Sequence, residues 1–106
     1  MIVNDSLNLA PAITEVLETV FDPEIPVNIV ELGLVYELIT KEDGIAKVVM
    51  TLTAPGCPVA GDIIDEVQRK VADVEGVKQA LVELTFDPPW DKSMMSDVAR
   101  LELGFM

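Results

Sequence analysis

The sequence predicts an α+β fold, a two-layer sandwich with helices on one face of a small three-stranded mixed sheet. Apolar residues recur at helical spacing in two long segments, residues 9–21 and 60–76. Between them, residues 34–53 form two strand-like runs around an Asp-Gly turn, and residues 77–86 form a third. The expected order is helix, strand, strand, helix, strand, helix, in one domain that spans residues 1–106, because packing helices on a sheet buries all these stripes.

The first helix is expected over residues 9–21. Pro11 suits its first turn, where the missing N–H of proline removes no helical hydrogen bond. The segment Asp22-Pro23-Glu24-Ile25-Pro26 should end the helix, because proline disfavours the helical conformation in the residue before it. Asn28 and Glu31 then have the spacing of a capping box for a single turn. Gly33 is expected to stop that turn.

The hairpin follows, with strands at residues 34–40 and 45–53 joined by Lys41-Glu42-Asp43-Gly44. A second helix is expected from Pro58, with Gly76 as its C-terminal cap. After the strand at residues 77–86, a short helix is expected from about Ser93 to Gly104.

Charge and composition exclude several classes of function. The 106 residues have a formal net charge of −12, which repels nucleic-acid phosphates and anionic membrane surfaces. The apolar runs are too short to span a bilayer, and the N-terminus does not resemble a secretory signal. With no histidine, triads that use an imidazole are excluded. The single cysteine favours a reducing, cytoplasmic location.

The segment Thr51-Leu52-Thr53-Ala54-Pro55-Gly56-Cys57-Pro58 is the strongest chemical signal. Cys57 is expected at the start of the second helix, where unpaired N–H groups lower a thiol pKa. A small buried cysteine is the alternative interpretation. Thr51 and Thr53 should share one strand face and lead into this segment. Asp22 and Glu24 either line a site or serve only to form their turn.

Together these segments resemble the SufT-like family of small iron–sulfur cluster assembly domains, which also includes PaaD-like proteins and a eukaryotic cytosolic assembly component. The further matching segments are Glu31-Leu32-Gly33-Leu34-Val35-Tyr36, Phe86-Asp87-Pro88-Pro89-Trp90 and Met95-Ser96-Asp97-Val98-Ala99-Arg100. The resemblance spans nearly the whole chain in family order. It implies an accessory factor in cluster assembly or delivery and no enzymatic turnover.

The resemblance also implies the site. The family cysteine corresponds to Cys57, the acidic turn to Asp22 and Glu24, and the lining residues to Thr51 and Thr53. The cargo would be an iron–sulfur cluster or iron, held transiently with Cys57 as the metal ligand. One thiolate falls short of the four ligands that clusters usually have, so a homodimer or a client would complete the set. Expected partners are other assembly proteins and client apoproteins, with no nucleic acid and no membrane.

Two other functions fit the same residues. A non-metal adaptor would use the Cys57 segment only as a contact surface for assembly factors. A thiol redox sensor would need a mixed or intersubunit disulfide, because the chain has no second cysteine to resolve an oxidised Cys57.

Overall fold

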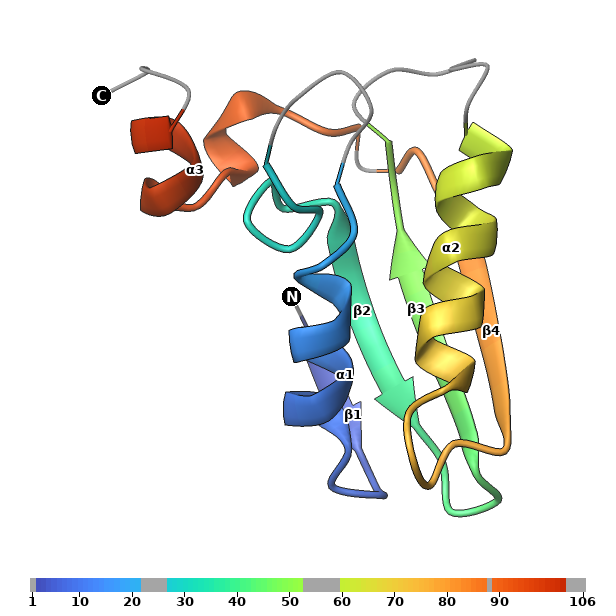
Figure 1. Ribbon diagram of the computed structural model, residues 1–106. Helices are drawn as coiled ribbons and strands as arrows, with labels where there is room; N and C mark the ends of the chain where they lie inside the picture. Colours follow the sequence, from blue (N-terminus) through green and yellow to red (C-terminus); the bar gives the residue numbers. More distant parts are fainter. Residues whose placement is uncertain (1, 22–26, 53–59, 88, 103–106) are drawn as a thin grey trace.

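In the computed structural model, a four-stranded sheet carries α1 and α2 on one of its faces (Figure 1). The structure describes residues 2–21, 27–52, 60–87 and 89–102. In chain order the elements are β1 (Ile2–Asp5), α1 (Ala10–Leu17), β2 (Val35–Thr40), β3 (Ile45–Met50), α2 (Ala60–Ala72), β4 (Gln79–Leu84), the 3₁₀ helix η1 (Lys92–Met94) and α3 (Asp97–Glu102). The α+β class is confirmed.

The prediction of a three-stranded sheet is wrong, because the sheet has four strands. The predicted order of elements is also wrong, because a strand, β1, precedes the first helix. The strands lie in the order β1-β2-β3-β4, with β1 parallel to β2, β2 antiparallel to β3, and β3 parallel to β4. The additional strand, β1, has only four residues and an exposed pattern, so it lacks the alternation that marks a half-buried strand. Its pairing with β2 is a tertiary contact that local sequence does not encode.

The β2–β3 hairpin forms at the predicted Asp-Gly turn. The Gly44 N–H donates to the Lys41 carbonyl at 2.9 Å, and the Lys41 N–H donates to the Ile45 carbonyl at 2.9 Å. Gly44 has a φ of +93°, a conformation that glycine adopts without steric cost. The Asp43 carboxylate also accepts from the Ile45 N–H. Turn chemistry therefore sets the register of the two central strands.

Both long helices are shorter than their apolar patterns predict. After Leu17, the Thr19 and Val20 N–H groups donate to carbonyls three residues earlier, so the chain tightens into a 3₁₀-type turn. The helix α2 ends at Ala72, and Gly76, with a φ of +98°, lies in the loop that follows rather than at a cap. Local turns thus end both helices before their apolar stripes stop.

One core joins the helices, the sheet and the turn before β2. Its fully buried members include Ile13, Leu17, Ile29, Leu32, Leu34, Leu38, Val48, Met50, Val67 and Val71. The helices α1 and α2 contribute Ile13, Leu17, Ile63, Val67 and Val71 from the apolar faces that the helical periodicity predicts, whereas Val16 and Ile64 are half-buried and Ala12 is exposed. The short helix α3 lies beyond the end of the sheet rather than on its covered face (Figure 1). It packs there through the fully buried Ala99.

Asp5 fastens the N-terminal strand to the rest of the molecule. Its carboxylate accepts hydrogen bonds from the Leu9 and Ala10 N–H groups at 2.9 and 2.8 Å. It also accepts from the Thr40 hydroxyl at 2.7 Å. Burial raises the pKa of Asp5, but these hydrogen bonds together outweigh it and hold the pKa below the ordinary value of 3.8. One side chain therefore links β1, the start of α1 and the end of β2.

Candidate functional site

Four of the five predicted site residues, Asp22, Glu24, Thr53 and Cys57, lie outside the described residues. They belong to two segments, residues 22–26 and 53–59, whose flanking chain the structure does describe. The fifth, Thr51, is described. The structure therefore defines the frame from which these segments depart.

Backbone hydrogen bonds join the chain before and after the first segment, residues 22–26. Phe21 and Asn28 form an antiparallel bridge, and the Ile29 N–H donates to the Val20 carbonyl at 2.9 Å. The described chain on either side of the segment that contains Asp22 and Glu24 is thus paired by backbone hydrogen bonds.

The chain that leads into the second segment, residues 53–59, is hydrogen-bonded to the same region. The Thr51 N–H donates to the Leu34 carbonyl at 2.8 Å, and the Leu34 N–H donates to the Ile29 carbonyl at 3.0 Å. Ile29 is the residue that donates to Val20 across the first segment. A continuous run of hydrogen bonds therefore connects the chain flanking Asp22 and Glu24 with the chain leading to Thr53 and Cys57. The start of β2, the end of β3 and the start of α2 all lie at this end of the molecule (Figure 1).

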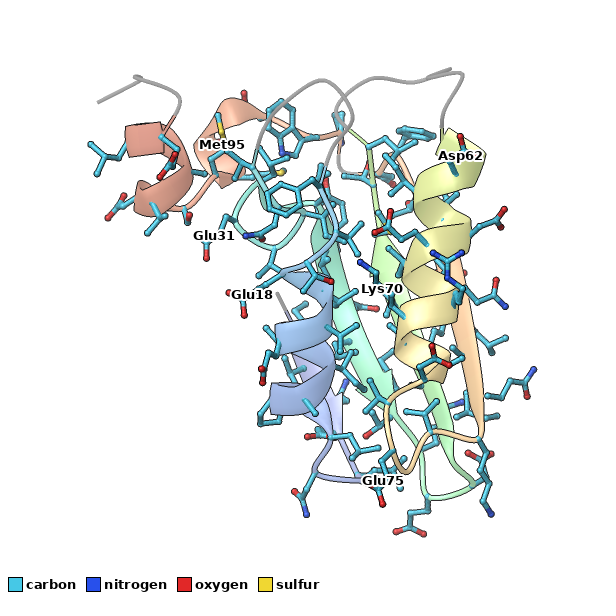
Figure 2. The ribbon with its side chains drawn as sticks, viewed as in Figure 1. Glu18, Glu31, Asp62, Lys70, Glu75 and Met95 are labelled. Atoms are coloured by element: carbon cyan, nitrogen blue, oxygen red, sulfur yellow. The ribbon has the colours of Figure 1, made fainter. Side chains whose placement is uncertain are left out.

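The turn before β2 is built largely as the sequence predicts. The Asn28 side-chain oxygen accepts from the Val30 and Glu31 N–H groups, both at 3.0 Å, which is half of a capping box. The other half is absent from these contacts, because the Glu31 carboxylate instead accepts from the Ser96 hydroxyl. Gly33 follows with a φ of +79°. Figure 2 shows Glu31 and Met95 at the end of the molecule that carries α3.

The C-terminal motifs support this turn rather than forming a separate site. The Trp90 indole N–H donates to the Leu32 carbonyl at 2.7 Å. The Ser96 N–H donates to the Glu31 carbonyl at 2.8 Å. The tryptophan and serine motifs thus satisfy polar groups of the turn, which explains why the chain needs them beside the candidate site.

Thr51 has an unusual environment. Its side chain is fully buried, and its hydroxyl oxygen makes no hydrogen bond with the described part of the chain. An unpaired buried hydroxyl costs about 1–3 kcal/mol.

Tyr36 is a neighbour of Thr51 that the sequence did not single out as a site residue. Burial raises the pKa of its phenol, and the Thr51 side chain beside it offsets part of that rise. The phenol O–H donates to the Met94 sulfur at 3.6 Å. Its place in the Glu31-to-Tyr36 motif was the one signal that could have identified it.

Within residues 2–21, 27–52, 60–87 and 89–102, no group of three or more acidic, histidine or cysteine side chains is placed to hold a metal ion. Among these same residues, none of the helices has the length and apolar character needed to cross a membrane.

The fold is a small α+β domain with a mixed four-stranded sheet, and the chain that flanks residues 22–26 and 53–59 is joined by hydrogen bonds at one end of that sheet. Residues 11–84 match the family of iron–sulfur cluster assembly proteins. The chain is 52% identical over 103 residues to a protein of Porphyromonas gingivalis called an Fe-S protein maturation auxiliary factor, and the match covers 97% of this chain and 98% of that protein. The chain therefore belongs to the iron–sulfur cluster assembly protein family.

Further comparisons agree. The Fe-S protein maturation auxiliary factor SufT of Staphylococcus aureus is 42% identical over 85 residues, which cover 80% of this chain and 97% of that protein. A crystal structure of a domain of unknown function from Bacillus anthracis has a TM-score of 0.84 and 39% identity, covering 91% of this chain and 92% of that one. The resemblance to SufT-like proteins is thus confirmed.

Proposed function

We propose that this protein is an accessory factor that helps to assemble iron–sulfur clusters or deliver them to client proteins, without catalysing turnover of a small substrate. Family membership supports the pathway. One structural observation carries the site: backbone hydrogen bonds through Ile29 and Leu34 connect the flanks of the acidic segment and the cysteine segment. The described chain that flanks the segments containing Asp22, Glu24 and Cys57 therefore lies at one end of the sheet, which supports this site.

The cluster, or iron alone, is the cargo. Cys57 supplies a thiolate, the soft ligand that iron in clusters prefers, and its proton is released when the metal binds. Asp22 and Glu24 supply hard oxygen ligands or polar lining. Thr51 and Thr53 line the approach, and the burial of Thr51 beside the Tyr36 phenol, where the described chain leads into residues 53–59, supports this role. One thiolate per chain makes a weak site, which suits cargo that must leave.

The remaining ligands come from outside the chain. They belong to a second copy of the protein, another assembly protein or the thiolates of a client. Transfer then proceeds by exchange of ligands, in which client thiolates replace Cys57 on iron and no electron is transferred. This exchange takes place in the cytoplasm, where thiols stay reduced.

Anaerobic reconstitution with ferrous iron and sulfide tests direct ligation by Cys57. Bound iron and acid-labile sulfide are measured for the wild type, for Cys57→Ala and for Glu42→Gln. Glu42 is an exposed carboxylate in the β2–β3 hairpin turn, at the other end of the sheet. We expect Cys57→Ala to lose at least tenfold in bound iron and Glu42→Gln to bind as the wild type does.

Equal loading of the wild type and Cys57→Ala would refute ligation by Cys57. An adaptor function would then be favoured if Cys57→Ser still supports activation of an apo iron–sulfur enzyme. The exposed apolar side chains at this end of the molecule, including Phe21, are the observation that favours this second candidate.

A further inference from the structure

A shallow groove lies between the chain around the Phe21–Asn28 bridge and helix α3. Its volume is about 270 Å³, and its lining residues are Phe21, Val27, Asn28, Glu31, Val98 and Glu102. This volume lies below the range of about 300–1,000 Å³ typical of pockets for small ligands. The groove has room for an apolar side chain that an approaching protein segment would insert.

Exposed apolar side chains extend the groove along α3. Val98 and Leu101 are 59% and 71% exposed, and Phe21 is 53% exposed. Val98 and Leu101 are three residues apart and share one face of the helix. The fully buried Ala99 holds the opposite part of α3 against the body of the protein. The helix therefore presents an apolar face that its own packing does not use, and exposed patches of this kind often mark interaction sites.

The charges around this face are mainly negative. Glu31 and Glu102 line the groove, and the exposed Asp97 begins the helix. Arg100, the one basic residue of α3, donates a guanidinium N–H to the Ser93 carbonyl at 3.0 Å. The whole chain has a net charge of −12, which attracts basic partners and repels a second copy of itself.

We propose that the groove and the Val98–Leu101 face bind a basic amphipathic segment of a protein partner. An apolar side chain of the partner fills the groove, and its Lys or Arg side chains pair with Glu31 and Glu102. Phe21 directly precedes Asp22 in the sequence, so a partner bound here contacts the chain that leads into the proposed acidic site residues. The identity of the partner as a cluster client rests on the proposed function, whereas the binding chemistry does not.

The test uses the full ¹⁵N-labelled chain and a synthetic helical peptide with leucine on one face and lysine on the other. A matched peptide with glutamate in place of lysine is the control. We expect the lysine peptide to shift the amide signals of Phe21, Asn28, Val98 and Glu102 and to bind at least tenfold more tightly than the glutamate peptide. Shifts confined to other surfaces, or equal binding of both peptides, would overturn the proposal.

Two kinds of variant separate the apolar and charged contributions. Val98→Ser with Leu101→Ser should weaken binding of the lysine peptide at least tenfold, whereas Leu81→Ser should not. Leu81 is 38% exposed and lies on β4, opposite Lys47 of β3. Leu81→Ser therefore replaces an exposed apolar side chain with serine at a position outside α3, which makes it the control. Glu102→Lys should weaken binding of the lysine peptide and strengthen binding of the glutamate peptide. Unchanged binding in the Val98→Ser, Leu101→Ser double variant or in Glu102→Lys would contradict the assignment.

Two further measurements distinguish the remaining outcomes. If a second copy fills the groove, light scattering will show dimers that the two serine substitutions dissociate, which would overturn the proposal. Iron loading is measured separately. If the wild type binds the lysine peptide but no iron, the proposed function fails and the docking surface stands. If iron loads normally but the peptide does not bind, the docking surface alone fails.

Discussion

Replacing Asp5 tests how much the hydrogen bonds of its carboxylate, which connect β1 with α1 and β2, contribute to stability. Asp5→Ala removes acceptors for the Leu9 and Ala10 N–H groups, which lie 2.9 and 2.8 Å away, and for the Thr40 hydroxyl at 2.7 Å. Losing a side-chain acceptor at a helix start costs about 0.5–2 kcal/mol. Thr40 is 1% exposed, so its hydroxyl would be left buried without this acceptor, which costs about 1–3 kcal/mol.

Because these losses share one side chain, they overlap, and we expect a total of about 2–3 kcal/mol in the free energy of unfolding. For a domain of this size, that lowers the melting temperature by roughly 10–20 °C. Urea titration and thermal unfolding at neutral pH measure both quantities. Asp65→Ala, an exposed carboxylate on α2, is the control and should change stability by less than about 0.5 kcal/mol.

The pH dependence gives a second readout. The hydrogen bonds hold the native pKa of Asp5 below its ordinary value of 3.8, so the native state binds this proton more weakly than the unfolded state does. The associated stability is therefore present above about pH 4 and is lost as the pH falls through the native pKa. The stability gap between the wild type and Asp5→Asn should shrink over this acidic range. A loss below about 0.5 kcal/mol in Asp5→Ala, or a gap that widens in acid, would refute the reasoning.

Two further changes test the frame of the candidate site. Gly33→Ala should destabilise the protein by more than about 2 kcal/mol, because a Cβ there would clash with the η1 backbone and the φ of Gly33 is positive. Gly61→Ala on α2 is the control: its Cβ meets no atom within 4 Å, so it should be neutral or stabilising. Equal stabilities of the two variants in urea titration would contradict this prediction. Thr51→Val should raise stability by up to about 1 kcal/mol, because it removes a buried hydroxyl that makes no well-formed hydrogen bond with the described residues, while lowering iron loading in the anaerobic assay. Unchanged loading would show that the Thr51 hydroxyl takes no part in the site.

The secondary structure that depends on local rules was predictable from the sequence. The Asp-Gly turn encodes the hairpin, and Gly44 adopts the positive φ that this turn requires. The periodicity of α1 and α2 indicates the face of each helix that holds its buried residues. The Asn28 cap was also predictable, because its side chain reaches N–H groups only two and three residues away.

Long-range pairing was not predictable in this way. The strand β1 is stabilised by its ladder with β2 and by the contact of Asp5 with Thr40, 35 residues away. The Glu31 carboxylate pairs with Ser96, 65 residues away, instead of completing its local capping box. Neither partner appears in any local window of sequence.

The sequence by itself determined which groups are available for chemistry: one thiol, an acidic turn and no imidazole. Only the tertiary structure decided that the flanks of the acidic and cysteine segments are joined through Ile29 and Leu34. The physical reason is that composition and spacing limit the chemistry, whereas packing and hydrogen bonds between distant residues determine which groups can act together.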